Sequence, residues 1–247
     1  MGKLDGKKAL VTGASRGIGK GIALALAEAG ADVAIGYRRE KEAADAVVRA
    51  VEDLGRCGAA FAADVRDREA VDAMVNGARE TLGGLDIVVA NAGVPTRFEA
   101  THEIDPGYWD RVLQIDLYGV FYTLRAALPH LREQRDGVIL TVSSIAADAC
   151  GGKGAPYNAA KAGVNALTKT ISRENARRNV RCNVIAPGLI QTDIADGMKD
   201  FHGDLEKSIP LGRIGTIEEI GALAVYLSSK EAEWITGKVF RIDGGQW

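Results

Sequence analysis

Short apolar runs alternate with longer amphipathic stretches along the chain. The apolar runs are rich in β-branched residues and are almost continuous rather than alternating, as expected of strands that are buried on both faces of a sheet. The longer stretches between them predict helices such as Gly17–Ala29, Glu40–Leu54 and Arg68–Leu82. The apolar runs predict seven strands: Lys8–Thr12, Asp32–Tyr37, Ala59–Asp64, Ile87–Ala90, Val138–Val142, Val180–Ala186 and Val239–Ile242.

This order of strands and helices predicts an α/β fold with a doubly wound, seven-stranded parallel sheet. A length of 247 residues is compatible with one domain and is ample for a buried core. The glycines are scattered through loops, and only 151–154 is locally rich in them. Since no repeat, low-complexity tract or linker divides the chain, we expect residues 1–247 to form a single domain.

The composition of the chain argues against several kinds of binding partner. With 31 basic and 33 acidic side chains the formal charge is −2, so no global basic field attracts nucleic acid or anionic lipid. No run of about 18 apolar residues predicts a membrane span, and the N-terminus has no signal-type apolar region. The odd number and wide spacing of Cys57, Cys150 and Cys182 argue against a disulfide framework and a zinc site. We therefore expect a cytoplasmic protein without nucleic acid, membrane or metal.

A glycine-rich turn joins the first predicted strand to the first predicted helix. Gly13, Gly17 and Gly19 would let the backbone approach a pyrophosphate, and the helix N-terminus would direct N–H groups towards it. Their spacing is G-x-x-x-G-x-G, which differs from the usual dinucleotide fingerprint, and no Gly-Lys-[Ser/Thr] completes a Walker A loop. The alternative is a glycine-rich turn without a ligand.

The end of the second predicted strand indicates the choice of cofactor. Folds that bind NAD usually place an acidic residue there to bind the ribose 2′-hydroxyl, whereas a 2′-phosphate requires positive charge. Here the acid is missing, and Arg38 or Arg39, with Arg16 from the glycine turn, could clamp that phosphate. The pattern favours NADP over NAD, the alternative being two solvated arginines at a helix start.

Tyr157 and Lys161 are four residues apart, with Ser144 thirteen residues upstream of the tyrosine. A helix brings positions i and i+4 onto one face, so the ammonium of Lys161 can lie beneath the phenol. A cation there favours the phenolate and suits the phenol to general acid/base work. Ser144 would hold the oxygen of the substrate. Tyr-x-x-x-Lys also occurs on ordinary amphipathic helices, so its context matters.

Taken together in order, these motifs resemble the short-chain dehydrogenase/reductase family along the whole chain. They are most similar to the 3-oxoacyl-acyl-carrier-protein reductases of fatty acid synthesis. The family is built on a Rossmann fold, which agrees with the predicted doubly wound sheet. The segments that carry the resemblance are Thr12–Gly19, Asp64-Val65, Asn91-Ala92-Gly93, Ser144, Tyr157–Lys161, Pro187–Thr192 and Ile242–Gly245.

The resemblance implies a role for each matching position. Ser144, Tyr157 and Lys161 would be catalytic, and Lys161 would also hold the hydroxyls of the nicotinamide ribose. Asp64 could instead be a helix cap, and Pro187-Gly188 a simple turn. The other residues would bind the cofactor: Gly13, Ser15, Arg16, Gly17, Ile18 and Gly19 at the phosphates, Arg38 at the 2′-phosphate, Asp64 and Val65 at adenine, Asn91, Ala92 and Gly93 at the adenosine ribose, and Pro187, Gly188, Ile190 and Thr192 at the nicotinamide carboxamide.

The chain departs from the family pattern at two positions. Ala90 replaces the first asparagine of the family's Asn-Asn-Ala-Gly, which should loosen a hydrogen bond near the fourth strand. Asp116 stands where the family carries a fourth catalytic residue, an asparagine that positions a water chain leading to the lysine. An aspartate could hold the same water while adding negative charge, and its effect on the rate stays open.

The region after Pro187-Gly188 varies with substrate in the family. Ile190, Ile194 and Met198 recur every four residues, with Phe201 three further on, which suggests a helical substrate lid within about 189–212. The alternative is a plain packing helix.

Two features concern protein partners. Arg135 and Arg178 fall where acyl-carrier-protein reductases carry docking arginines, although basic residues at two helix ends also occur by chance. Family members pair the helix that starts at Pro156 across a two-fold axis, which implies a homotetramer. In this chain that helix carries small residues that allow close approach: Ala159, Ala160, Gly163 and Ala166.

The sequence therefore favours an NADPH-dependent reductase that converts a carbonyl, in particular that of a 3-oxoacyl thioester, to a secondary alcohol. One alternative is a dehydrogenase of small secondary alcohols, sugars or polyols, because family members act on many substrates. An alternative of another class is a catalytically silent dinucleotide-binding regulator, which only the Asp116 departure supports.

Overall fold

A computed structural model describes residues 2–150, 152–192 and 207–247 of the chain. Its strands form one parallel sheet in the order β3-β2-β1-β4-β5-β6-β7, so the predicted fold class is confirmed. The predicted third strand is placed slightly too late, because pairing with β2 ends at Ala62. The strands are β1 Lys8–Thr12, β2 Asp32–Tyr37, β3 Gly58–Ala62, β4 Ile87–Ala90, β5 Gly137–Val142, β6 Val180–Pro187 and β7 Val239–Ile242.

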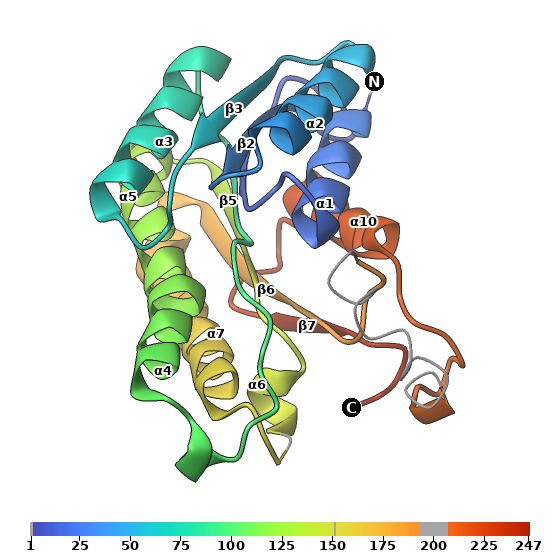
Figure 1. The fold of residues 1–247 in the computed structure, drawn as a ribbon. Helices are drawn as coiled ribbons and strands as arrows, with labels where there is room; N and C mark the ends of the chain where they lie inside the picture. Colours follow the sequence, from blue (N-terminus) through green and yellow to red (C-terminus); the bar gives the residue numbers. More distant parts are fainter. Residues whose placement is uncertain (1, 151, 193–206) are drawn as a thin grey trace.

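Helices cover both faces of the sheet (Figure 1). Helices α1, α2 and α10 lie on one face, and α3, α5 and α7 lie on the other. None of the helices in the described ranges is both long and apolar enough to cross a membrane. The helices are α1 Gly17–Glu28, α2 Lys41–Asp53, α3 Arg68–Leu82, α4 Pro106–Leu113, α5 Gly119–Gln134, α6 Ala146–Ala149, α7 Ala155–Asn175 and α10 Ile217–Ser228, with short turns η1 Thr101–Glu103, η2 Gln114–Tyr118, η3 Ala176–Arg178 and η5 Lys230–Ala232.

Two apolar layers hold the helices to the sheet. Successive side chains of a strand point to opposite faces, so a strand buried on both sides must be apolar throughout. Along β1, Val11 packs in the layer under α1 and α10, whereas its neighbour Leu10 packs in the layer under α3 and α5. Ile35 and Ala34 of β2 divide between the layers in the same way. This double burial explains the continuous apolar runs of the sequence.

The strand order reverses between β1 and β4, because β2 continues from one side of β1 and β4 pairs with the other. In open parallel sheets this switch point leaves a crevice beyond the carboxyl ends of the strands. The turn after β1, Arg38 after β2 and Asn91 after β4 all follow those ends. Ser144 after β5 and Gly188 after β6 belong to the same edge, so the topology gathers the predicted site residues there.

Candidate active site

The turn after β1 has the geometry of a phosphate-binding loop. Gly13 and Gly17 have φ of +65° and +55°, a conformation that favours glycine. A Cβ at Gly13 would lie 2.8 Å from the Cα of Ala92, so the turn packs tightly against the segment after β4. Helix α1 begins at Gly17, and its N-cap Arg16 makes no side-chain cap hydrogen bond. The first N–H groups of α1 are therefore suited to an anion.

Hydrogen bonds between Thr12 and Asn91 join the ends of β1 and β4. The hydroxyl Oγ1 of Thr12 accepts from the backbone N–H of Asn91 at 3.0 Å and of Ala92 at 3.1 Å. The side-chain amide of Asn91 donates to the carbonyls of Thr12 at 2.9 Å and Gly13 at 3.1 Å. Asn91 thus fixes the glycine turn from the neighbouring strand. From the sequence, Thr12 was placed in the Thr12–Gly19 segment but was assigned no role of its own.

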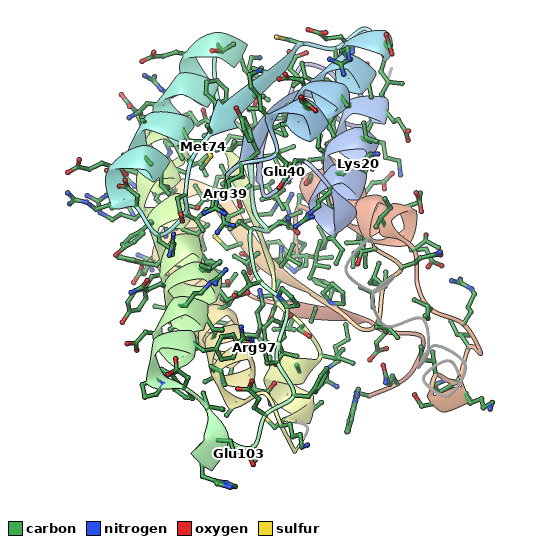
Figure 2. The ribbon with its side chains drawn as sticks, in the orientation of Figure 1. Lys20, Arg39, Glu40, Met74, Arg97 and Glu103 are labelled. Carbon is green, nitrogen blue, oxygen red and sulfur yellow. The ribbon has the colours of Figure 1, made fainter. Side chains whose placement is uncertain are left out.

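The positions proposed for the 2′-phosphate and for adenine follow β1, β2 and β3. Arg16 and Arg38 are exposed, and so is Arg39, which Figure 2 shows after the carboxyl end of β2. Asp64 is not a helix cap, because Asp67 caps α3 by accepting from the N–H groups of its first turn. Instead, Asp64 is held by the guanidinium of Arg66.

Val65, the second position expected at adenine, is largely buried and packs against the long central helix. A Cβ at Gly119, the first residue of α5, would lie 2.7 Å from Cγ2 of Val65. The glycine therefore lets α5 approach the segment after β3 closely, which positions Val65 and its neighbour Asp64.

Tyr157 and Lys161 lie in the first two turns of α7. Pro156 is the second residue of the helix, and the N-cap residue, Gly154, has φ of +85°. The Lys161 Nζ lies 5.5 Å from the centroid of the Tyr157 ring, so the predicted i, i+4 face brings the cation and the ring together. Ser143, at the end of β5, donates to the carbonyl of Lys161 at 3.1 Å. This bond ties the strand end to the helix.

Ser144 follows directly after Ser143 at the carboxyl edge of the sheet. Its Oγ accepts a hydrogen bond of 3.1 Å from the backbone N–H of Ala146 at the start of α6. A hydroxyl oxygen that accepts in this way still has its own hydrogen to donate. Ser144 can therefore donate to a carbonyl oxygen in the crevice.

Lys161 forms a buried ion pair with Asp116. Its Nζ lies 3.1 Å from Oδ1 of Asp116, and the side chains are 4% and 0% exposed. The ammonium also donates to the carbonyl of Val142 at 3.1 Å, and the carboxylate accepts from the N–H of Val94. The sequence suggested that a water would separate the two charges. The structure instead shows direct contact, because the carboxylate reaches the ammonium itself.

Burial shifts the pKa of each member of this pair, and the charge of the partner opposes that shift. Burial raises the pKa of the Asp116 carboxyl, and the Lys161 ammonium opposes that rise. Burial by itself lowers the pKa of Lys161, but the charge of Asp116, the nearby Tyr157 and the hydrogen bond to Asp116 together more than compensate, so the pKa of Lys161 is raised. Asp116 thus keeps the buried lysine charged.

A π-helical turn brings Asp116 to this position. Helices α4 and α5 are continuous through η2, and Gln114–Tyr118 forms the π turn between them. Such turns insert one extra residue into a helix and re-aim the side chains that follow, often at functional sites. Within η2, Ile115 and Asp116 are buried whereas Tyr118 is exposed. No spacing of apolar residues in the sequence distinguishes this turn from an ordinary helix.

The segment after β6 continues the sheet rather than forming a simple turn. The carbonyl of Pro187 accepts from the N–H of Ile145, and the N–H of Gly188 donates to the carbonyl of Ile242. A Cβ at Gly188 would lie 2.8 Å from Cβ of Asp243. Farther along, Thr192 approaches the glycine turn, with its Cγ2 3.6 Å from the position of a Cβ at Gly17. Residues that follow β1 and β6 therefore meet at the carboxyl edge of the sheet.

The sequence suggested that Ile190 belongs to a stripe that covers the substrate. In the structure it does not. It is 6% exposed and packs in the apolar layer under α1 and α10. Its backbone pairs with Gly215, which explains why the side chain turns inward. The other members of the suggested stripe, Ile194, Met198 and Phe201, lie outside the described residues.

A loop after β4 borders the start of α7. The guanidinium of Arg97, labelled in Figure 2, lies 4.4 Å from the ring centroid of Tyr108, and the Arg97 N–H donates to the Tyr108 hydroxyl. The carbonyl of Glu99 accepts from Gly154, immediately before α7. These contacts hold the loop beside the helix that carries Tyr157.

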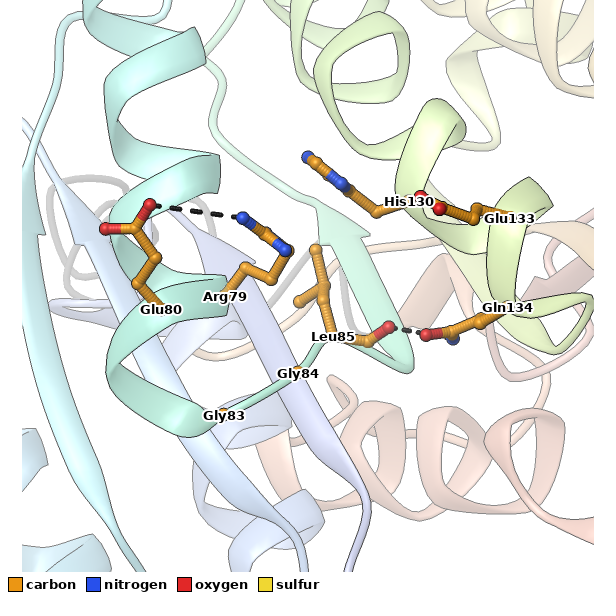
Figure 3. A pocket seen from close by; sticks show the side chains of 8 residues that line it. All are labelled: Arg79, Glu80, Gly83, Gly84, Leu85, His130, Glu133 and Gln134. Atoms are coloured by element: carbon orange, nitrogen blue, oxygen red, sulfur yellow. Dashed lines mark hydrogen bonds and ion pairs between the residues drawn. The ribbon is translucent and has the colours of Figure 1, made fainter.

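A hollow of about 390 Å³ lies away from these residues, between the end of α3 and the end of α5 (Figure 3). Leu85, on its wall, precedes β4, so the hollow belongs to the amino edge of the sheet. Gln134 donates to the Leu85 carbonyl across it. Since the predicted residues gather at the opposite edge, this hollow is not part of the candidate site.

The doubly wound sheet and the glycine turn at its switch point define a protein of the Rossmann class. The family model described as Enoyl-(Acyl carrier protein) reductase matches residues 13–246. The chain is 41% identical to the 3-oxoacyl-[acyl-carrier-protein] reductase FabG of Staphylococcus aureus over 243 residues, which cover 98% of each protein. The chain therefore belongs to the short-chain dehydrogenase/reductase family.

Relatives with other names are nearly as similar. A 3beta-hydroxysteroid dehydrogenase of Eggerthella lenta is 38% identical over 250 residues, which cover 98% of this chain and 94% of the relative. A short-chain type dehydrogenase/reductase from Mycobacterium marinum has a TM-score of 0.93 and 36% identity, covering 98% of this chain and 96% of that one. The family thus defines an oxidoreductase, whereas the substrate requires an argument from the site.

Proposed function

We propose that the protein is an NADPH-dependent reductase that converts a carbonyl to a secondary alcohol, with 3-oxoacyl thioesters as its substrates. The observation that carries the proposal is the arrangement of Tyr157 above a buried, charged Lys161 at the edge where the glycine turn opens. This edge is where α/β proteins bind nucleotides. The proposed setting is the cytoplasm, and the three cysteines of the chain are free in the structure.

The residues at this edge fit a dinucleotide. The turn from Gly13 to Gly19 presents a helix N-terminus without a side-chain cap, as a pyrophosphate requires. When bound, NADPH supplies the hydride. Arg16 and Arg38 would hold the 2′-phosphate, and Lys161 the hydroxyls of the nicotinamide ribose. Asp64, Val65 and Asn91–Gly93 would line the adenosine, and Pro187, Gly188, Ile190 and Thr192 would border the nicotinamide.

Each residue of the catalytic set has one task. Ser144 donates a hydrogen bond to the carbonyl oxygen of the substrate. Tyr157 gives its phenolic proton to the same oxygen as negative charge develops there. Lys161 stabilises the phenolate that remains, because a cation close to the ring favours its charged form. Asp116 is a positioning residue that holds Lys161 in place and keeps it charged.

Two observations support an acyl-carrier substrate. The reductase from Staphylococcus aureus is named for such a substrate, and it matches the chain over almost its whole length. In addition, the guanidinium of Arg135 donates to the carbonyl of Arg177, so Arg135 and the neighbouring Arg178 lie on one surface. An acidic carrier protein is suited to a patch of this kind.

A substrate panel tests the proposal. We expect NADPH oxidation with acetoacetyl thioesters, with a higher kcat/KM for the carrier-linked acyl group than for its short thiol analogue. Arg135→Ala and Arg178→Ala should lower only the carrier-linked value. A preference for small ketones, sugars or steroid ketones would favour the second candidate, a secondary-alcohol dehydrogenase, which the Eggerthella lenta relative supports. Tight NADPH binding without turnover of any carbonyl would favour a silent regulator.

The choice of cofactor should depend on Arg38. A charge-assisted hydrogen bond to the 2′-phosphate is worth roughly 1.5–3 kcal/mol, or about 10- to 150-fold in affinity. We expect Arg38→Ala to reduce the ratio of kcat/KM for NADPH over NADH by a factor in this range. Arg49→Ala, on the exposed part of α2, is the control. A wild-type preference for NADH, or a ratio that Arg38→Ala leaves unchanged, would reject the clamp.

We propose a homotetramer with two-fold interfaces. Ala159 and Ala166 of α7 are exposed and allow close approach, and Phe121 of α5 is 43% exposed. Ala160 and Gly163 serve another purpose, because Ala160 is buried and Gly163 faces Leu117 within the same chain. Light scattering should give the mass of four chains of 26.1 kDa. A single-chain mass at micromolar concentration would contradict this assembly.

A further inference from the structure

Both oxygens of the Asp64 carboxylate accept hydrogen bonds from one arginine, Arg66. Nε of Arg66 donates to both carboxylate oxygens, at 3.0 and 3.1 Å, and Nη2 donates to Oδ2 at 2.6 Å. The backbone N–H of Arg66 adds a bond of 3.1 Å to Oδ1. Such a two-pronged arginine contact is strong and fixes the orientation of both groups. The charge of Asp64 is therefore largely compensated from its own loop.

This pair lies beside the arginine proposed to bind the 2′-phosphate. Strands β2 and β3 pair up to Tyr37 and Ala62, and the N–H of Ala63 donates to the carbonyl of Tyr37 at 2.7 Å. Arg38 and Asp64 therefore follow the ends of adjacent strands. Arg66 and, more weakly, Arg38 lower the pKa of the Asp64 carboxyl, so the charge of Arg38 reaches this carboxylate.

An uncompensated carboxylate at this place would oppose the binding of a 2′-phosphate in two ways. It would repel the phosphate, because like charges near a surface interact appreciably across several ångströms. It would also attract the guanidinium of Arg38, which is exposed and can turn towards it. Other Rossmann proteins favour NAD by an acidic residue at the end of the neighbouring second strand.

We propose that Arg66 determines cofactor choice by neutralising Asp64, which leaves Arg38 available for a 2′-phosphate on the adenosine ribose. Arg66 is thus a positioning residue that need not touch the phosphate. This inference rests on the proposed NADP dependence. It goes beyond that proposal because none of the roles assigned above includes Arg66.

Equilibrium binding to fragments of the cofactor tests the inference without any turnover. Isothermal titration calorimetry would give the Kd of adenosine 2′,5′-bisphosphate and of adenosine 5′-monophosphate, whose ratio isolates the 2′-phosphate. Effects on adenine binding cancel in this ratio. The variants are Arg66→Ala, Asp64→Asn and the double variant, with Arg68→Ala as a matched control, since Arg68 is exposed and contacts only Glu69 at 3.6 Å among the ion pairs described.

We expect Arg66→Ala to weaken the preference for the bisphosphate on the order of tenfold. The same change made together with Asp64→Asn should restore the preference to within about twofold of the value for Asp64→Asn alone, because no carboxylate then remains to be neutralised. Arg68→Ala should leave the ratio unchanged. Thermal unfolding of each variant would establish that it is folded before titration.

Two results would overturn the inference. If Arg66→Ala lowered the ratio equally with and without Asp64→Asn, Arg66 would bind the phosphate directly. If Arg66→Ala left the ratio at the wild-type value, Asp64 would have no influence on the phosphate. Failure of the NADP proposal itself would be visible separately, as a wild-type protein that binds the two fragments equally.

Discussion

Tyr157→Phe should lower kcat/KM for carbonyl reduction by about 10²- to 10⁴-fold, the usual contribution of a positioned general acid. Phenylalanine keeps the ring that lies 5.5 Å from the Lys161 ammonium but removes the hydroxyl that would give its proton to the substrate. The ion pair between Lys161 and Asp116 does not involve that hydroxyl. We therefore expect the Kd for NADPH, measured by fluorescence quenching, to change little while the rate collapses.

Tyr226→Phe is the matched control, because Tyr226 is 37% exposed on α10, away from the first turns of α7 that carry Tyr157. It should retain the wild-type kcat/KM. If Tyr157→Phe kept more than a tenth of the wild-type value, proton transfer from Tyr157 would not be part of the reaction.

Asp116→Asn should move the alkaline limb of the reduction rate to lower pH. At present Asp116 raises the pKa of Lys161 against the effect of burial, so the lysine stays charged to high pH. Without this carboxylate the buried lysine loses its proton more readily. Where the lysine remains charged, the Asp116 carboxylate no longer offsets its field, so the Tyr157 phenol ionises more readily. Both consequences act in the same direction, since reduction needs the protonated phenol and the charged lysine.

The shift should be large because the two side chains are in direct contact. Opposite charges about 4 Å apart interact by roughly 4 kcal/mol at an effective dielectric constant of 20, and about 1.4 kcal/mol corresponds to one pH unit. We expect a shift of about one to three pH units in the profile of kcat/KM, read as a property of the coupled group. Asp110→Asn, on the exposed side of α4, should not move the limb. An unmoved or raised limb for Asp116→Asn would mean that Asp116 is uncharged in the working enzyme.

The strands could be predicted closely because burial on both faces leaves a continuous apolar signal. Lys8–Thr12 and Ile87–Ala90 have the bounds that the sequence indicated. The third strand was extended too far because Asp64 follows an apolar run without a break, and only the end of the pairing between β2 and β3 at Ala62 shows that Asp64 belongs to the loop. A local pattern cannot show where a neighbouring strand stops pairing.

In the candidate site, too, features set within one helix could be predicted, whereas contacts between distant segments could not. The spacing of Tyr157 and Lys161 predicted their common face, because that face is a property of one helix. The contact between Lys161 and Asp116 depends on a π turn in a different helix, and the inward position of Ile190 depends on pairing with Gly215. These contacts arise only when distant segments pack. The motif order nevertheless predicted both Asp116 and Ile190 as candidate site residues.

The reaction itself is the most direct test of the account. Purified protein, NADPH and a carrier-linked 3-oxoacyl thioester should yield the 3-hydroxyacyl thioester, with one NADPH consumed for each alcohol formed and a much lower rate with NADH. The Tyr157→Phe variant in the same assay would show that the turnover belongs to this site. Absence of alcohol formation from any carbonyl in the panel, or a preference for NADH in the wild-type protein, would contradict the account.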